Sequence, residues 1–279
     1  MSTLSNIALA NNAQTQFQQL LAEHWQTANK EQIFFRKDPD TFRMNGKLPE
    51  MSAKGRERRA QYNQSLLKRL GNIDLTELSQ GDQVTYRLFK YERQAEARSY
   101  QQIDHFFPLT YYSGFHSYFA GAPANMSFLT TKDYDNYLVS LADFPRYNQD
   151  HITDLTVAIE KGYTQYCESF KNYHKSISKH LVNNVEKSDF WGPLAALPNN
   201  FSAKDKAHYR KAAKQLIADK VIPEYQKFYD FFTQEYMTNC RKVAGINSID
   251  GGDEYYKYLI NYYTTTDLSA DEIHQLGLN

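Results

Sequence analysis

The feature that most constrains this chain is an unbroken helical spacing of large apolar side chains through its middle. Such a residue recurs at every third or fourth position, as Ile152, Leu155, Ile159, Tyr163, Tyr166, Phe170, Tyr173, Ile177 and Leu181. This spacing is typical of the buried face of one helix. It predicts a spine helix of about 35 residues that starts at Pro145 and extends roughly 50 Å, with a bend at Gly162.

Helical spacing also dominates the rest of the chain. The other predicted helices cover about residues 5–33 (ending before Asp38-Pro39), 53–70, 80–99, 131–143 and 203–245, the last with a kink at Pro223. The helix at 80–99 is expected to bury Val84, Leu88, Tyr91 and Ala95. No useful strand-like alternation and no repeat is visible. The predicted fold class is therefore all-α, a multi-helix array around one long spine helix, and residues 1–279 are interpreted as a single helical region.

The segment from His105 to Thr130 interrupts this pattern. Pro108, Gly114, Gly121 and Pro123 alternate there with aromatic side chains. Long connections of this kind are usually either functional or packed down by their own side chains. The sequence predicts an aromatic loop and leaves both interpretations open.

Charge and composition exclude several classes of partner. Lys and Arg (32) balance Asp and Glu (32), so no basic field is available to recruit nucleic acid. The 22 Tyr and 17 Phe lie mostly at helical spacing and are expected to fill the core. No stretch approaches the roughly 20 apolar residues of a membrane span. We expect neither nucleic acid binding nor a membrane span.

Candidate residues for chemistry are few. Cys167 and Cys240 are expected to be buried, inert thiols, with Cys167 on the apolar face of the spine helix. His174 and His180 are expected to be solvated or to cap a helix, and His151 with Asp154 is expected to be a surface pair. The sequence contains no His-Glu dipeptide and no Gly-x-Ser-x-Gly elbow. We therefore assign no catalytic residue, no metal ligand and no cofactor to this chain.

The end of the chain looks unfinished. Ser269 and Glu272 have the spacing of a capping box, so a last helix is predicted to start near Ala270. Leu276 and Leu278 of that short helix need a covering surface. We interpret the chain as a fragment, incomplete without a C-terminal half, and the surface from Gly251 to Leu278 as an interface.

Several of these segments resemble consecutive landmarks of one bacterial family. They are Pro223-Glu224-Tyr225, Gly251-Gly252-Asp253-Glu254-Tyr255-Tyr256, Tyr263-Thr264-Thr265-Thr266 and the segment from Ser269 to Gly277, with weaker similarity in Gly114-Phe115-His116 and in the block from Asn125 to Phe128. The family is catalogued as domain of unknown function 885. Its members are about twice this length and often exported or lipid-anchored lipoproteins, and they look like zinc metallopeptidases whose His-Glu and Pro-Gly-His motif lies in the C-terminal half.

The resemblance implies the N-terminal, substrate-cleft-forming half of a zinc metallopeptidase-like hydrolase, catalytically incomplete in this chain. Zinc is implied for the full-length family only. A peptide substrate would contact Gly251, Gly252, Tyr255 and Tyr256, although core packing explains these residues as well. The expected partner is the missing C-terminal half, or a second copy through self-association. The alternative is a non-catalytic helical interaction or ligand-binding module.

The compartment follows from the start of the chain. The first residues lack the long apolar run of a secretory signal, so the chain as written is expected to be cytoplasmic. The tripeptide Ala8-Leu9-Ala10 is similar to a signal cleavage site. If a signal peptide was trimmed there, the protein is expected to be periplasmic or lipid-anchored.

Overall fold

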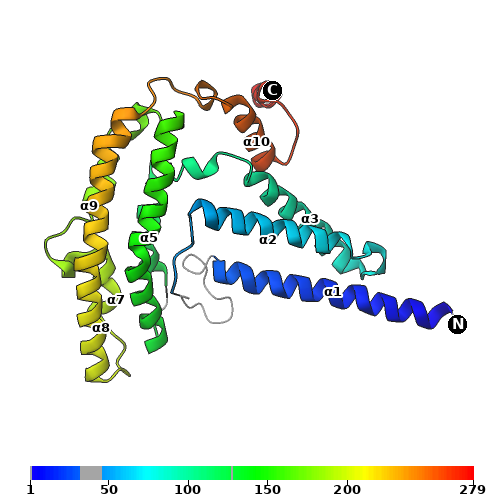
Figure 1. The fold of residues 1–279 in the computed structure, drawn as a ribbon, viewed down its shortest axis with the longest axis horizontal. Coiled ribbons are helices and arrows are strands. Elements are labelled where there is room, and N and C mark those ends of the chain that lie inside the picture. The colour runs from blue at the N-terminus through cyan, green and yellow to red at the C-terminus, as the bar shows by residue number, and fades with distance from the viewer. Residues whose placement is uncertain (1, 32–45, 127) are drawn as a thin grey trace. The chain divides into compact units, whose positions relative to one another are not determined.

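The computed structural model describes residues 2–31, 46–126 and 128–279 and is built almost entirely from helices (Figure 1), which confirms the all-α prediction. Within the described residues the strands are a two-stranded antiparallel hairpin, β1 (Leu109–Thr110) and β2 (Ser113–Gly114). No helix in these ranges is long and apolar enough to cross a bilayer. The predicted end of the first helix at Asp38-Pro39 lies outside the described residues.

The chain divides into two compact units, of which the first comprises Met1–Gln32 and Glu50–Gln102. It contains α1 (Ser2–Glu31), α2 (Ala53–Gly71), a 3-10 turn η1 (Leu75–Glu77) and α3 (Gln80–Ser99), close to the predicted ranges. Ser52 and Ser79 cap α2 and α3 by accepting hydrogen bonds from backbone amides. The core of this unit is one apolar cluster that includes Phe17, Leu20, Leu66, Leu70, Tyr86 and Phe89.

The predicted buried stripe of α3 is wrong. Val84 is 63% exposed and Leu88 57% exposed, whereas Tyr86 and Phe89 face the core. The helix carries two apolar stripes at similar spacing. The stripe with Tyr86 and Phe89 is the one that packs, because it faces the apolar cluster that α1 and α2 form with it.

The second unit comprises Ile33–Pro49 and Ile103–Asn279. Its long helices are α5 (Thr131–Lys161), α8 (Ala203–Leu216) and α9 (Ile222–Phe231), and α5 packs against both of the others (Figure 1). Shorter elements of this unit include η2 (Asp104–Phe106), α4 (Phe115–Gly121), η3 (Ala122–Asn125), η4 (Cys167–Phe170), α6 (His174–Ser178), η5 (Val185–Lys187), η6 (Asp189–Trp191) and α7 (Gly192–Ala195).

The spine helix exists, but its boundaries differ from the prediction. Helix α5 starts at a capping box formed by Thr130 and Asp133 and runs through Pro145 without a break. It ends at Gly162, which adopts the left-handed conformation with φ of 72°. Beyond Gly162 the buried apolar residues lie in other elements, since Phe170 belongs to η4 and Ile177 to α6. The regular apolar spacing therefore joined three separate elements, α5, η4 and α6, into one predicted helix.

Helices α8 and α9 form a continuous rod that contains two π-helical turns. The first, η7 (Ile217–Val221), joins α8 to α9, and the second, η8 (Phe232–Tyr236), leads into the 3-10 turn η9 (Met237–Asn239). Buried residues recur here at every fourth position, as Tyr209, Ala213, Ile217, Val221 and Tyr225. The wider π turn keeps this four-residue spacing on one face, which a straight α-helix would lose. The predicted break at Pro223 corresponds to the exit from η7.

The segment from His105 to Thr130 is not the predicted long loop. It folds into η2, the β1–β2 hairpin, α4 and η3, and its aromatic side chains Phe106, Phe115 and Phe119 are buried. Phe119 stacks on Phe144 of α5 with ring centroids 4.1 Å apart. Packing therefore accounts for these three aromatic residues, whereas Tyr111, Tyr112 and Tyr118 are exposed.

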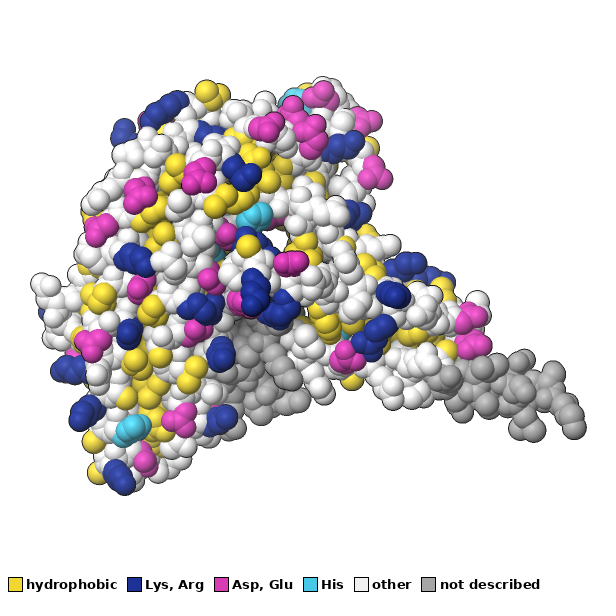
Figure 2. All heavy atoms as spheres, viewed as in Figure 1, with side chains coloured by type: hydrophobic (Ala, Val, Ile, Leu, Met, Phe, Trp, Pro, Cys, Tyr) yellow, Lys and Arg dark blue, Asp and Glu magenta, His cyan; other side chains and the backbone are white. Residues whose placement is uncertain are grey.

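The C-terminal region consists of η10 (Ile246–Ser248), α10 (Gly252–Thr264) and α11 (Ala270–Leu278). The predicted capping box of Ser269 and Glu272 is confirmed. Acidic side chains gather over α10 and α11 (Figure 2), and Lys257 is the lone Lys or Arg between Asp250 and Asn279. This part of the surface is therefore negatively charged.

Candidate functional site

The glycine turn before α10, which contains predicted substrate contacts, is also needed for close backbone packing. Gly251 adopts the left-handed conformation with φ of 68°, and the Gly252 amide donates to the Ile249 carbonyl at 3.0 Å. A Cβ atom on Gly252 would lie 2.0 Å from the carbonyl oxygen of Ile246. A side chain at position 252 is therefore incompatible with this turn.

The two tyrosines after the turn lie in different environments. Tyr255 is buried, and its hydroxyl donates to Asp104 Oδ1 at 2.7 Å. Burial, followed by the hydrogen bond and the charge of Asp104, raises the pKa of Tyr255 above its usual range. Tyr256 is 48% exposed. The turn therefore brings Gly251, Gly252 and Tyr255 together, and only Tyr256 offers its hydroxyl to an incoming ligand.

We expect Gly252→Ala to lower the free energy of unfolding by about 2 kcal/mol or more, because a Cβ at this position overlaps a backbone carbonyl. Gly277→Ala is the matched control, since nothing lies within 4 Å of its added Cβ on α11. That substitution should be neutral or slightly stabilising. Urea denaturation followed by circular dichroism measures both, and equal midpoints for the two variants would contradict this role of Gly252.

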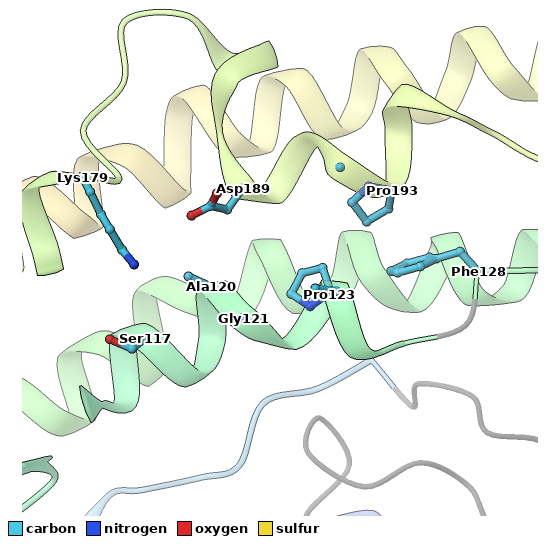
Figure 3. Close-up of a pocket in the computed structure, with 10 residues that line it drawn as sticks. Ser117, Ala120, Gly121, Pro123, Phe128, Lys179, Asp189 and Pro193 are labelled. Atoms are coloured by element: carbon cyan, nitrogen blue, oxygen red, sulfur yellow. The ribbon is translucent and has the colours of Figure 1, made fainter. Parts of the chain in front are cut away.

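A cavity of about 500 Å³ lies elsewhere in the same unit, between α4–η3 and the η6–α7 segment (Figure 3). One wall is formed by Ser117, Ala120, Pro123 and Phe128. The other wall is formed by Lys179, Asp189 and Pro193. Figure 3 shows Ser117 and Lys179 at one end and Phe128 at the other, so the cavity has a polar end and an apolar end.

Buried tyrosines of the long helices hold both walls of the cavity. Tyr134 of α5 donates to the carbonyl of Pro193 at 3.0 Å. Tyr225 of α9 donates to the carbonyl of His116, next to Ser117, at 2.7 Å. Both tyrosines are almost fully buried. The cavity walls are therefore attached to the helical core, as a preformed ligand site requires.

Asp189 is oriented by a buried histidine. His180 is 3% exposed, and its Nδ1 lies 3.2 Å from Asp189 Oδ2. Burial, followed by the charge of Lys179, lowers the pKa of His180 to about 4, even though Asp189 acts in the opposite direction. His180 is therefore neutral at pH 7, and it orients the Asp189 carboxylate without cancelling its charge. The prediction of a solvated or capping His180 is wrong.

Ser117 is held by a second buried histidine. His116 Nε2 lies 3.1 Å from Ser117 Oγ and 3.0 Å from Ser176 Oγ. The Ser176 hydroxyl donates to the carbonyl of Tyr173, so the Nε2–H of His116 is the donor to both serines. Burial, followed by the charges of His180, Lys179 and His151, lowers the pKa of His116 to about 3. The hydroxyl hydrogen of Ser117 is then available to a ligand in the cavity.

These histidines do not form a catalytic triad. The histidine beside Ser117 is His116, whereas the histidine beside Asp189 is His180, and a triad needs one imidazole between both groups. His151 and Asp154 are 4% and 6% exposed, so the prediction of a surface pair is wrong. Within the described ranges no three His, Cys, Asp or Glu side chains come together in a way that would hold a metal ion.

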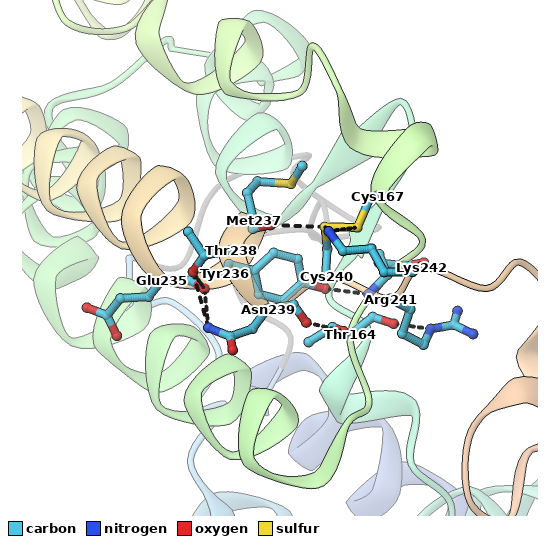
Figure 4. Close-up of a disulfide and its surroundings, with 11 residues drawn as sticks. Thr164, Cys167, Glu235, Tyr236, Met237, Thr238, Asn239, Cys240, Arg241 and Lys242 are labelled. Carbon is cyan, nitrogen blue, oxygen red and sulfur yellow. Dashed lines mark hydrogen bonds between the residues drawn. A yellow bond between two sulfur atoms is a disulfide. The ribbon is translucent and has the colours of Figure 1, made fainter.

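A disulfide joins Cys167 to Cys240 across 73 residues (Figure 4), which overturns the prediction of two inert thiols. The two chain segments also pair through the backbone, because the Cys167 amide donates to Arg241 O at 3.0 Å. Cys167 lies in η4, beyond the end of α5, so it is not on the face of the spine helix. The closed loop contains Lys179, Asp189 and Pro193, and thus one whole wall of the cavity.

Sequence reasoning missed the cavity and the disulfide. The cavity residues come from two separate parts of the chain, and a lone Lys or Asp reads as an ordinary solvated side chain. The glycine turn was found because its signal is local: two glycines precede a helix that carries aromatic residues.

Comparison with known proteins identifies relatives by family and by fold. The model of a family described as "Bacterial protein of unknown function (DUF885)" matches residues 34–279. No curated protein matches the chain. A similar solved structure is described as "The crystal structure of the putative lipoprotein from Colwellia psychrerythraea", with a TM-score of 0.66 and 18% sequence identity. The match covers 98% of this chain and 48% of that protein, so the chain spans about half of its length.

Proposed function

The chain belongs to the bacterial family of unknown function DUF885, and on this premise we propose that it forms the substrate-cleft half of a hydrolase resembling zinc peptidases. The observation that carries the proposal is an exposed set of large apolar side chains on α10 and α11. We name this set the C-terminal apolar surface: Tyr256, Tyr262, Tyr263, Leu276 and Leu278, each between 48% and 78% exposed. Several large exposed apolar side chains on two consecutive helices favour an interaction site at this end of the chain.

The proposed occupant of this surface is the remaining part of a longer protein of the same family. The chain corresponds to 48% of the related solved structure, which leaves a segment of similar size to cover it. Exposed acidic side chains lie on the same two helices, including Asp253, Glu254 and Glu272. Charge complementarity therefore predicts basic residues at the rim of the covering segment.

The side chains present indicate which groups of the proposed active site this chain supplies and which come from the covering segment. The described residues do not fit a zinc site, so the ligands implied by the family resemblance would come from the covering segment. This chain would supply binding groups to the cleft. Tyr256 is the best placed of the four predicted substrate contacts, because its exposed hydroxyl can donate to a peptide carbonyl or to an oxyanion.

The chain itself allows a direct test of the interface. We expect its molar mass in light scattering to rise with concentration, because the C-terminal apolar surface is uncovered. A variant carrying Tyr263→Lys and Leu276→Lys should remain monomeric. Val243→Lys, at a residue 63% exposed outside this surface, is the control and should behave like the wild type. A strictly monomeric wild type whose α10 and α11 amides exchange as slowly as those of α5 would overturn the interface.

The reading frame after the Asn279 codon tests the hydrolase. A frame that continues into a His-Glu motif should yield a longer protein that binds zinc and cleaves peptides. In that protein we expect Tyr256→Phe to lower kcat, whereas Tyr262→Phe should leave kcat unchanged. A stop codon directly after Asn279 would instead favour the ligand-binding module, for which the cavity beside Lys179 and Asp189 is the supporting observation.

We propose that the protein works in an oxidising compartment, periplasmic or lipid-anchored. Disulfides persist in such compartments and are rare in the cytosol of most bacteria. The Cys167–Cys240 bridge supports this placement. Alkylation of intact cells followed by mass spectrometry should find both cysteines protected until a reductant is added, and two free thiols would contradict the placement.

A further inference from the structure

The cavity between α4 and η6 combines two opposite charges with an apolar end, and these charges do not neutralise each other. Lys179 and Asp189 both line it, but no ion pair joins them within the described part of the chain. Figure 3 shows both side chains directed into the gap between the two walls. Both side chains are exposed, so both charges are open to a ligand, and a ligand with only one charge would pair with only one of them. The best complement carries both charges.

The remaining lining defines the rest of the ligand. Ser117 lies at the same end of the cavity as Lys179 (Figure 3), so this end offers a hydroxyl and an ammonium group as donors. Such a pair suits a carboxylate. The opposite end is lined by Pro123, Phe128 and Pro193, which offer contacts to an apolar side chain. The volume of about 500 Å³ suits a small molecule rather than a long peptide.

We propose that this cavity binds a small zwitterionic ligand of the amino-acid class that carries an apolar side chain. Its carboxylate lies between Lys179 and Ser117. Its ammonium group lies at Asp189, which buried His180 holds in place. Its side chain packs against Pro123 and Phe128. This binding is independent of the proposed hydrolase, because every residue involved lies in the 279-residue chain.

Calorimetric titration of the chain with L-phenylalanine tests the proposal. We expect saturable binding that weakens about tenfold or more in Lys179→Met and in Asp189→Asn, because each removes one charge-assisted hydrogen bond. The Asn side chain keeps an oxygen for His180, so the wall should stay intact. Lys175→Met is the matched control, since Lys175 is exposed on α6 and does not line the cavity. It should bind like the wild type.

Two analogues assign each end of the ligand. L-phenylalaninamide lacks the carboxylate, and N-acetyl-L-phenylalanine lacks the ammonium group. The wild type should prefer L-phenylalanine over both. Lys179→Met should lose the preference over the amide, and Asp189→Asn should lose the preference over the acetylated form. The proposal is overturned by an absence of saturable L-phenylalanine binding at millimolar concentration, or by equal affinities in the wild type and both variants.

Discussion

Removing the Cys167–Cys240 disulfide is expected to lower the free energy of unfolding by about 4 kcal/mol. The bridge closes a loop of 73 residues, and the chain-entropy cost that it removes from the unfolded state is about this size. The bridged segments also share the pairing of Tyr166 with Arg241, so the loss is expected to loosen the junction of η4 with the end of the α9 rod.

Guanidinium denaturation of the double variant Cys167→Ser, Cys240→Ser measures this loss. The wild type treated with a reductant should show the same lower midpoint. The double variant should not respond to the reductant, which controls for effects unrelated to the bridge. If the wild type keeps its midpoint after both thiols have been shown to be free by titration, the disulfide does not stabilise the fold.

Acidification should destabilise the protein well above the pH at which its carboxylates titrate. His116 and His180 are buried and neutral, with pKa values of about 3 and about 4 against an ordinary value of 6.5. Below pH 6.5 the unfolded chain binds protons that the folded chain does not. Their stabilising contribution is therefore complete above pH 6.5 and is lost as the pH falls towards the folded values. The expected loss is about 2 kcal/mol per histidine between pH 7.5 and pH 5.

Some groups that face these histidines lower their pKa, and one raises it. His151, His180 and Lys179 oppose protonation of His116, whereas Asp189 favours protonation of His180. Urea midpoints measured from pH 7.5 to pH 5 should fall steeply for the wild type and about half as steeply for His116→Gln. His208 is exposed, so His208→Gln should keep the full slope. A wild-type midpoint that does not change over this range would show that the histidines are not buried as neutral groups.

Most of the helices could be predicted because apolar residues recur at every third or fourth position along a helix that buries one face. The capping box of Ser269 and Glu272 is a local signal, and α11 starts at Ala270, where that signal predicts. The sequence did not predict which side of a helix packs. In α3 both stripes have helical spacing, and only the neighbours in the fold select the stripe with Tyr86. Pro145 was read as a helix start, but buried packing on both sides of it keeps α5 continuous.

The candidate sites also differ in whether adjacent residues or residues far apart in the sequence form them. The Gly251-Gly252 turn was predictable because it is specified by adjacent residues. The disulfide depends on the approach of two segments 73 residues apart, and two cysteines in a long chain do not indicate that they meet. The cavity depends on charges from Lys179 and Asp189 being brought beside α4 by the packing of short elements. Periodicity carries no information on such long-range contacts.

The two π turns in the rod formed by α8 and α9 have a consequence for how this family can vary in length. A π turn holds one residue more than the α-helical turn it replaces. Loss of one codon within η7 or η8 would return that turn to α-helical hydrogen bonding and leave the residues on both sides facing the core as before. A deletion inside α8 would instead rotate everything after it by about 100°. Single-residue insertions and deletions in this rod are therefore expected to concentrate at these two turns.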